Sequence, residues 1–203
     1  MNQAWELLFE GRIEEAKKLV SKTFSLETCK DYSLLNLMGY IKLFEKDYKE
    51  ALLIYQNYLA IAISSQDKEN EHIGYHQLAM VYREMNDYQT ALNCIDKERE
   101  IIEESFSEDA LKSSVNNYEQ GYLRLKIGEI AKAIMYMEQS LKQALQTDDL
   151  IAQACSYRGL GEIYSVENSE KSQENFLQAI ELFEKAGDQV GAREVKTLLN
   201  KKK

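Results

Sequence analysis

Residues 75–95 read YHQLAMVYREMNDYQTALNCI, and this stretch contains the parts of a helical hairpin. Leu78 and Tyr82 lie at helical spacing ahead of a polar Asn-Asp-Tyr turn, and Ala91 and Ile95 resume the spacing after it. Apolar residues three and four positions apart indicate an amphipathic helix on each side of the turn. The stretch therefore predicts two helices that fold back on one another.

The distance of twelve residues between Ala79 and Ala91 recurs along the chain. A small residue is followed by a second small residue after twelve positions in three more places and after eleven in another: Ala4 to Ala16, Gly39 to Ala51, Gly121 to Ala133, and Gly161 to Ser172. Successive copies start 35 to 42 residues apart. Self-similarity at a period of about 20–50 residues is typical of a solenoid built from stacked repeats.

The small residues have a mechanical explanation. Glycine within a helix costs up to about 1 kcal/mol relative to alanine, so Gly39, Gly121 and Gly161 indicate a packing requirement. At a helix crossing, a bulky side chain would force the backbones apart at a cost of about 1–3 kcal/mol. In the turns, we expect the side chains that precede the second helices to cap their free amides; these are Asp47, Asp87 and Asn168.

These motifs resemble those of the tetratricopeptide repeat family, whose signature is W-x2-L-G-x2-Y, then A-x3-F, then P. Two copies match it well: Tyr75-x2-Leu78-Ala79-x2-Tyr82 with Ala91-x3-Ile95, and Tyr157-x2-Leu160-Gly161-x2-Tyr164 with Ser172-x3-Phe176. The units are mostly 40–42 residues long instead of about 34 and contain no proline. They are similar to the long-unit subclass found in kinesin light chains, bacterial peptide-sensing regulators and activators of signalling ATPases.

The resemblance implies an all-α fold, a right-handed superhelical solenoid of antiparallel helical hairpins with a C-terminal capping helix. We expect one domain over residues 1–203, with hairpins at about 2–26, 31–66, 70–106, 110–147 and 150–187 and the capping helix at 188–201. A cap is needed because the last hairpin would otherwise expose its apolar face. Four apolar residues are expected to face inward from the cap: Val190, Val195, Leu198 and Leu199.

In this family the first helix of each hairpin lines a concave groove, and residues beside the small position point into it. Carried onto this chain, the positions predict a binding groove that is aromatic near the N-terminus and more charged toward the C-terminus. Its residues are Trp5, Phe9, Asn36, Tyr40, Phe44, His76, Met80, Arg83, Tyr118, Tyr122, Lys126, Arg158 and Glu162. Tyr40 and Tyr122 are the main candidates because each follows a crossing glycine. The alternative for any of these residues is packing against the neighbouring hairpin.

Charge and cysteine content narrow the partners and the compartment. The net charge of −9, with dispersed lysines and arginines, disfavours direct nucleic-acid binding. No apolar run approaches the ~18 residues of a membrane span, and the N-terminus does not resemble a signal peptide. The three cysteines are widely spaced, which favours reduced thiols over disulfides or zinc ligation. We expect a cytoplasmic protein that does not bind membranes.

The sequence contains little that suggests catalysis. His72 and His76 are four residues apart on an expected helix, close to Glu69 and Glu71, and this spacing could place two imidazoles on one metal ion. A third ligand is not evident, and phosphate-binding, dinucleotide-binding and nucleophile motifs are missing. We therefore predict no catalytic residues, no metal and no cofactor, with a metal-dependent enzyme as a remote alternative.

The function expected from these features is a non-catalytic module that binds a segment of an unknown protein or peptide in its concave groove. The alternative is a peptide-sensing regulator related to bacterial pheromone receptors of this repeat family, which would act through a partner because the sequence shows no effector domain. Exposed solenoid ends also make a homo-oligomer possible.

Overall fold

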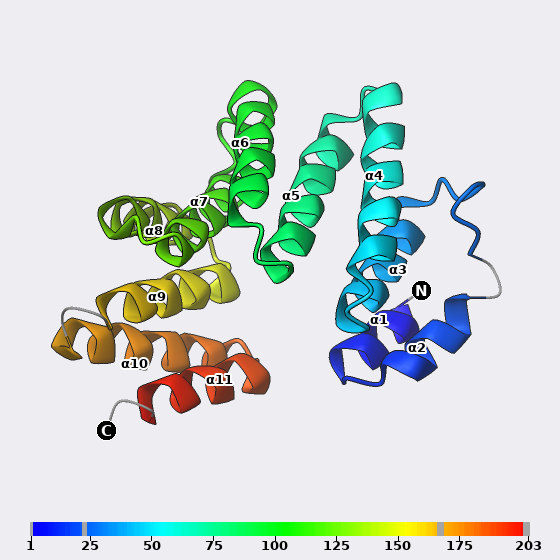
Figure 1. Cartoon of the computed structure of the whole chain (residues 1–203). Coiled ribbons are helices and arrows are strands. Elements are labelled where there is room, and N and C mark those ends of the chain that lie inside the picture. Colours follow the sequence, from blue (N-terminus) through cyan, green and yellow to red (C-terminus); the bar gives the residue numbers. More distant parts are fainter. Residues whose placement is uncertain (1, 22–23, 166–168, 201–203) are drawn as a thin grey trace. The chain divides into compact units, whose positions relative to one another are not determined.

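The computed structural model describes residues 2–21, 24–165 and 169–200, and these form eleven helices and no strand (Figure 1). In chain order the helices are α1 (Asn2–Phe9), α2 (Ile13–Val20), α3 (Tyr32–Phe44), α4 (Tyr48–Ser64), α5 (Lys68–Glu84), α6 (Tyr88–Ser105), α7 (Ala110–Lys126), α8 (Ile130–Ala144), α9 (Leu150–Tyr164), α10 (Ser169–Lys185) and α11 (Gln189–Asn200). The predicted all-α fold is confirmed.

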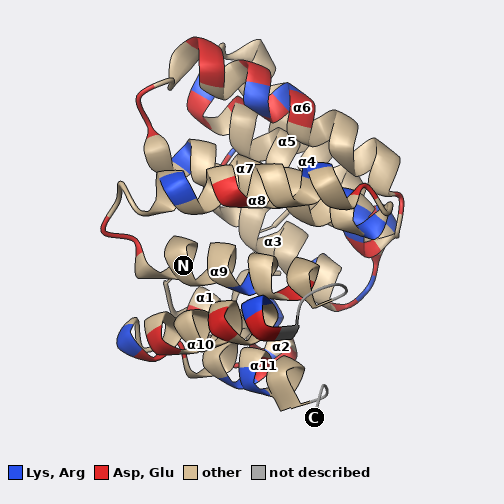
Figure 2. Ribbon diagram, turned by 90° about the vertical axis from the view of Figure 1, so that its left-hand side faces the viewer, with Lys and Arg blue, Asp and Glu red and all other residues tan. Residues whose placement is uncertain are grey.

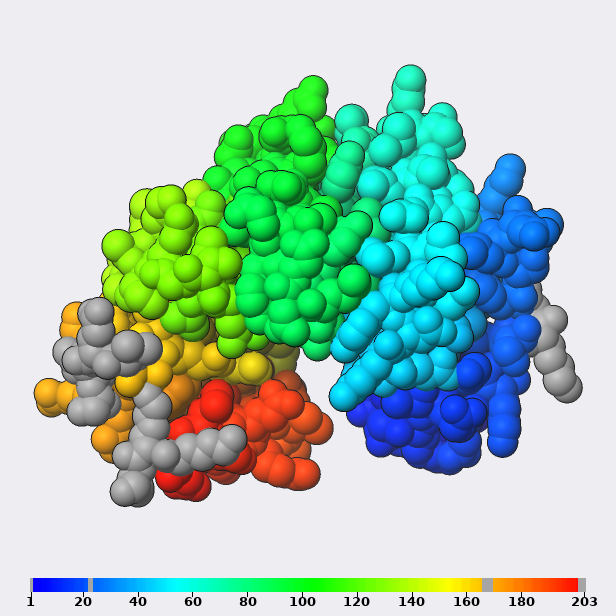
Figure 3. Space-filling view, viewed as in Figure 1, coloured from blue at the N-terminus to red at the C-terminus, as the bar shows by residue number. Residues whose placement is uncertain are grey.

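The chain divides into two compact units, Met1–Ile101 (unit 1) and Ile102–Lys203 (unit 2), and the boundary falls within α6. Inside each unit a helix packs on the next one in the chain, as α3 does on α4 and α9 on α10. First helices of successive hairpins also touch, α1 with α3 and α7 with α9. Side chains fill the spaces between these neighbours within each unit (Figure 3). The organisation of the whole chain as one domain stays a prediction.

The same turn joins the two helices of several hairpins. Between α3 and α4, Lys46 has a φ of 60°, and the Asp47 amide donates to the Lys42 carbonyl at 2.9 Å. Between α7 and α8, Gly128 has a φ of 82°, and the Glu129 amide donates to the Arg124 carbonyl at 2.9 Å. A left-handed residue followed by this long-range bond satisfies the last carbonyls of the first helix. The turn is therefore closed by backbone geometry.

Aspartates cap the helices that follow the turns. The Asp47 carboxylate accepts from the Glu50 amide at 3.3 Å, and Asp87 accepts from the Thr90 amide at 3.2 Å, which confirms these two predicted caps. Asn168, the third predicted cap, lies outside the described residues. Further aspartates cap the first helices of later hairpins in the same way: Asp31 on α3, Asp67 on α5, Asp109 on α7 and Asp149 on α9.

Close helix crossings explain the helical glycines. A Cβ atom on Gly39 would lie 2.3 Å from Cζ of Tyr55, and one on Gly161 would lie 2.5 Å from Cδ1 of Phe176. Tyr55 and Phe176 are both fully buried second-helix residues and have no room to move aside. The predicted packing requirement is confirmed at Gly39 and Gly161, where the contact is with the aromatic residue four positions after the second small residue. At Gly121 that position holds Met137, and an added Cβ atom would lie 3.1 Å from its nearest neighbours.

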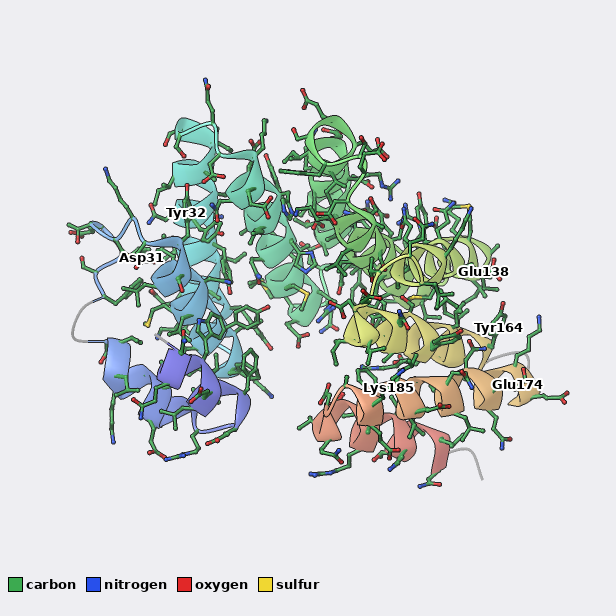
Figure 4. The ribbon with its side chains drawn as sticks, turned by 180° about the vertical axis from the view of Figure 1, so that it is seen from behind. Asp31, Tyr32, Glu138, Tyr164, Glu174 and Lys185 are labelled. Atoms are coloured by element: carbon green, nitrogen blue, oxygen red, sulfur yellow. The ribbon has the colours of Figure 1, made fainter. Side chains whose placement is uncertain are left out.

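The hydrophobic core runs between the hairpins of each unit. In unit 1 it includes Leu8, Leu35 and Ile54, and in unit 2 it includes Phe176 and Phe183. Polar contacts join neighbouring hairpins as well; the Tyr164 hydroxyl at the end of α9 donates to Glu138 on α8 at 3.2 Å (Figure 4).

The capping helix α11 packs on α10 and buries Val195, as expected, with Leu198 and Leu199 half-buried. The expectation for Val190 is wrong, because its side chain is 58% exposed. Val190 precedes Val195 by five residues, and this separation places the two side chains about 140° apart around the helix axis. Gly191 and Ala192 fill the inward position instead.

Candidate protein-binding groove

Each unit has a groove face of its own, which consists of the first-helix side chains beside the crossing positions: on α1, α3 and α5 in unit 1, and on α7 and α9 in unit 2. These helices are placed by the capped turns and close crossings described above. Each carries one stripe of residues toward its own second helix and a different stripe toward its neighbouring first helix. Some of the residues predicted from the sequence lie on the second stripe, among them Trp5 and Tyr40 in unit 1 and Tyr118 in unit 2.

An aromatic cluster, Trp5, Phe9 and Tyr40, joins α1 and α3 in unit 1. The Trp5 ring is stacked on Phe9 with centroids 5.6 Å apart and meets Tyr40 edge-on at 5.5 Å. Trp5 and Tyr40 are half-buried against the core, while Phe9 is 71% exposed. The structure therefore brings these three predicted residues together, with Trp5 and Tyr40 packed against the core and Phe9 open to solvent.

The other predicted residues of unit 1 are more dispersed. Phe44 ends α3 and is exposed, whereas Asn36 is half-buried and its carbonyl accepts from the Tyr55 hydroxyl at 3.3 Å. Met80 and Arg83 lie half-buried on α5, and the Arg83 guanidinium is 3.6 Å from the Glu84 carboxylate. Their roles in binding stay predictions.

His76 is engaged inside its own hairpin. Its Nδ1 lies 3.2 Å from Oε1 of Glu98 on α6, and Nδ1 of His72 lies 3.8 Å from the same oxygen. His72 and Glu98 are buried. The two histidines, one helical turn apart, therefore face a single buried carboxylate.

A row of predicted residues follows α7 in unit 2. The rings of Tyr118 and Tyr122 are stacked with centroids 6.3 Å apart, and Nζ of Lys126 lies 4.8 Å from the Tyr122 centroid. The two tyrosines are half-buried and Lys126 is exposed. The spacing of four residues places all three on one side of the helix.

Charged residues occupy the matching part of α9. Nε of Arg158 donates to Glu162 at 3.0 Å, and its Nη1 donates to Glu194 on α11 at 3.2 Å. Positive and negative residues are scattered over the ribbon of both units among a majority of uncharged ones (Figure 2). The arginine is therefore held by two carboxylates and presents a fixed, fork-shaped cation beside Tyr118.

A pocket of about 310 Å³ lies between α7 and α9, and we call it the α7–α9 pocket. Most of its wall is apolar and comes from the first half of each helix. The residues that line it are Leu111, Ser114, Val115, Tyr118, Glu119, Ser140, Asp149, Ile151, Ala152 and Cys155. Ser114 and Ser140 of this lining are buried, as is Ser156 on α9, and the Ser140 and Ser156 hydroxyl oxygens are 2.8 Å apart.

Burial controls the ionisation of the groups in this wall. It raises the pKa of the Cys155 thiol to about 11 and outweighs the opposite effect of the nearby Arg158 charge. Burial also raises the pKa of the Tyr118 hydroxyl. Both groups are consequently neutral at pH 7, and the thiol acts as a small apolar surface.

Of the ten residues that line the pocket, only Tyr118 was in the sequence prediction; the apolar ones that it missed include Leu111, Val115, Ile151 and Cys155. The prediction used only positions close to the crossing glycine, so it left out the first half of each first helix. A signal was present, because Leu111, Val115, Tyr118 and Tyr122 recur at helical spacing and form a second apolar stripe. Val115 and Ile151 are 37% and 40% exposed.

Within residues 2–21, 24–165 and 169–200, no three His, Cys, Asp or Glu side chains are grouped so that they could hold a metal ion. The helices of the same ranges include none with the length and apolarity of a membrane span.

Comparisons with known proteins agree with the fold. Residues 70–144, which cover α5 to α8, match the family model described as tetratricopeptide repeat. A search of curated proteins gives no significant match.

Solved structures with similar folds cover nearly the whole chain. BtubC (BKLC) from P. vanneervenii is 17% identical, with a TM-score of 0.65 over 94% of this chain and 86% of that one. A putative kinesin light chain with TPR-like repeats from Podosopora anserina is 16% identical, with a TM-score of 0.65 over 92% and 93%. Apo RapI is 15% identical, with a TM-score of 0.64 over 94% of this chain and 56% of that one.

The matched residues contain the third predicted hairpin and most of the fourth, and the structural matches extend the same fold to the hairpins on either side. Residues 70–144 therefore match the tetratricopeptide repeat family, and the solved structures show the same fold over nearly the whole chain.

Proposed function

We propose that this protein is a non-catalytic interaction module that binds segments of a partner protein on the groove faces of its two units. The observation that carries the proposal is the set of partly exposed aromatic residues on first helices in both units, Trp5 and Tyr40 in unit 1 and Tyr118 and Tyr122 in unit 2. Aromatic residues and arginine contribute most of the binding energy at protein interfaces. Here they lie on rigid helices at repeated positions.

Preorganisation supports the same proposal. Tyr118 and Tyr122 are stacked on each other, and Arg158 is fixed by Glu162 and Glu194. Side chains that are already ordered lose little conformational entropy when a partner binds, at a saving of about 0.5–1.5 kcal/mol for each. The arginine is committed to carboxylate pairs, which suits a role in positioning a ligand better than one in proton transfer.

The test compares groove tyrosines with a tyrosine on a second helix. Partners are first captured with the whole chain and identified by mass spectrometry, and the affinity of the purified partner is then measured by calorimetry. We expect Tyr122→Ala to weaken binding about tenfold or more, and Tyr40→Ala to weaken it as well. Thermal melting of each variant, followed by circular dichroism, establishes that it is folded.

The matched control is Tyr136→Ala on α8, where the ring is half-buried but lies on a second helix. Its affinity should equal that of the wild type. Unchanged binding by both groove variants would contradict the proposal. If the captured molecule is a short free peptide instead of a segment of a larger protein, the peptide-sensing regulator becomes the better description.

A further inference from the structure

We infer that the α7–α9 pocket receives one apolar side chain of the bound segment, and that a lysine or arginine of that segment lies beside this anchor, facing Asp149. The inference rests on the proposed groove function and names the chemistry of the partner at one point of it. It concerns unit 2 alone.

The size and lining of the pocket favour a single anchor. Its volume of about 310 Å³ is at the lower end of ligand pockets, which hold about 300–1,000 Å³. Leu111, Val115 and Ile151 provide most of the aliphatic wall, and the neutral Cys155 thiol adds to it. Val115 and Ile151 are more than one-third exposed, so an inserted side chain would remove apolar surface from water on both partners.

The charge at the rim selects a basic neighbour for the anchor. The Asp149 carboxylate lines the pocket and caps α9 through Oδ1, which accepts from the Ala152 amide at 2.9 Å. No lysine or arginine in the described part of the chain forms an ion pair with it. The cap of the neighbouring helix differs, because Asp109 on α7 is 2.8 Å from Nζ of Lys112.

Other charges near the pocket do not reverse this preference. Glu119 contributes a second carboxyl group to the lining, and the Arg158 guanidinium is held by Glu162 and Glu194. The rim therefore offers negative charge without a cation of its own beside Asp149. A cationic side chain next to the apolar anchor is the complementary partner, and charge complementarity of this kind also determines specificity.

The first experiment selects a phage-displayed library of random dodecapeptides on the immobilised whole chain. We expect enrichment of leucine, isoleucine, phenylalanine or methionine with lysine or arginine within two positions. Selected peptides are then synthesised with a fluorescent label, and their affinities are measured by anisotropy. Enrichment of acidic neighbours, or recovery of no binding peptide, would overturn the inference.

Two pairs of variants locate the anchor and its neighbour. Ala152→Trp should fill the pocket and weaken binding about tenfold, while Ala131→Trp, at an exposed position on α8, should leave it unchanged. Asp149→Asn keeps a side chain that can cap α9 but removes its charge, and should weaken basic peptides about threefold. Asp67→Asn, which alters the equivalent cap on α5, should have no effect.

Cys155 provides a direct reporter of occupancy. With Cys29 and Cys94 replaced by serine, saturating peptide should slow the reaction of the Cys155 thiol with N-ethylmaleimide several-fold. A peptide that binds without protecting Cys155, and equally well to Ala152→Trp, contradicts the pocket assignment. If Tyr122→Ala still abolishes the binding of that peptide, the proposed groove function stands. If neither Ala152→Trp nor Tyr122→Ala changes its affinity, the groove function fails as well.

Discussion

Unit 1 and unit 2 share a scaffold but differ in their groove faces. Gly39 crosses against Tyr55 in unit 1 much as Gly161 crosses against Phe176 in unit 2, and aspartates cap the first helices of both. On the groove face, however, Trp5 packs against other rings in unit 1, whereas Tyr118 lines an open pocket in unit 2. Residues that face the second helix of their own hairpin are constrained by packing, whereas residues that face the groove can differ between the two units.

The physical reason is the separation of two stripes on one helix. A side chain that points at the second helix is fully buried, so its volume is limited to that of glycine or alanine at the crossing. A side chain on the groove stripe has solvent beside it and tolerates many residue types. The contrast between the units therefore distinguishes the residues that stabilise the fold from those that we propose determine which partner binds.

The largest expected effect is at the shared crossings. Gly39→Ala and Gly161→Ala should each lower the free energy of unfolding by about 1–3 kcal/mol, because the new Cβ would overlap a buried ring. A Cβ atom added at Gly121 would lie 3.1 Å from its nearest neighbours, which is less crowded than at the other two glycines. Gly121→Ala should therefore change the free energy of unfolding by less than about 1 kcal/mol, because the better helix propensity of alanine offsets the tighter contact. Urea unfolding measures all three. Equal losses at Gly121 and Gly39 would break the account of the crossings.

Helix caps should give a smaller effect that is equal in the two units. Asp47→Ala and Asp149→Ala each leave a helix amide without its acceptor and should cost about 1 kcal/mol. The matching asparagine variants, Asp47→Asn and Asp149→Asn, should remain close to the wild type because asparagine caps nearly as well. Chemical unfolding at pH 7 distinguishes the pairs. A loss in one unit only would show that the turns are not equivalent.

The smallest effect is a pH dependence of stability. Hydrogen bonds from Asn70 lower the pKa of Asp67 in unit 1, and hydrogen bonds from Lys112 lower the pKa of Asp109 in unit 2, both from an ordinary value of 3.8. A depressed folded-state pKa contributes stability that is present above the unfolded value and is lost as pH falls through the folded one. Stability should therefore decline below about pH 4, and less so in Asp67→Asn and Asp109→Asn. Unfolding curves collected from pH 6 to pH 3 would contradict this if the variants matched the wild type.

Much of the scaffold could be predicted from the sequence because it depends on local patterns. The crossing glycines and the caps at Asp47 and Asp87 follow from helix geometry and turn chemistry, which act over a few residues. Val190 was misplaced because its neighbours Gly191 and Ala192 are small, and an apolar pattern alone favours the larger residue. The rotation of α11 about its own axis determines which of its residues face inward, and this rotation depends on how the helix packs against α10.

The groove could be predicted only in part. Tyr118 and Tyr122 follow from their positions beside the crossing, but the α7–α9 pocket requires the distance between two first helices that are 40 residues apart in sequence. His76 shows the opposite difficulty, since nothing local indicates that Glu98 would face it from α6. Contacts between separate helices are therefore the part that the sequence pattern does not reveal.

Site-specific photocrosslinking tests the central claim, that partners bind the groove face, most directly. A benzophenone amino acid is placed at Lys126 on the groove side of α7, or at Met135, which is exposed on α8, and the protein is irradiated with its purified partner. The account predicts an adduct from position 126 and none from position 135. An adduct from position 135 alone would contradict it.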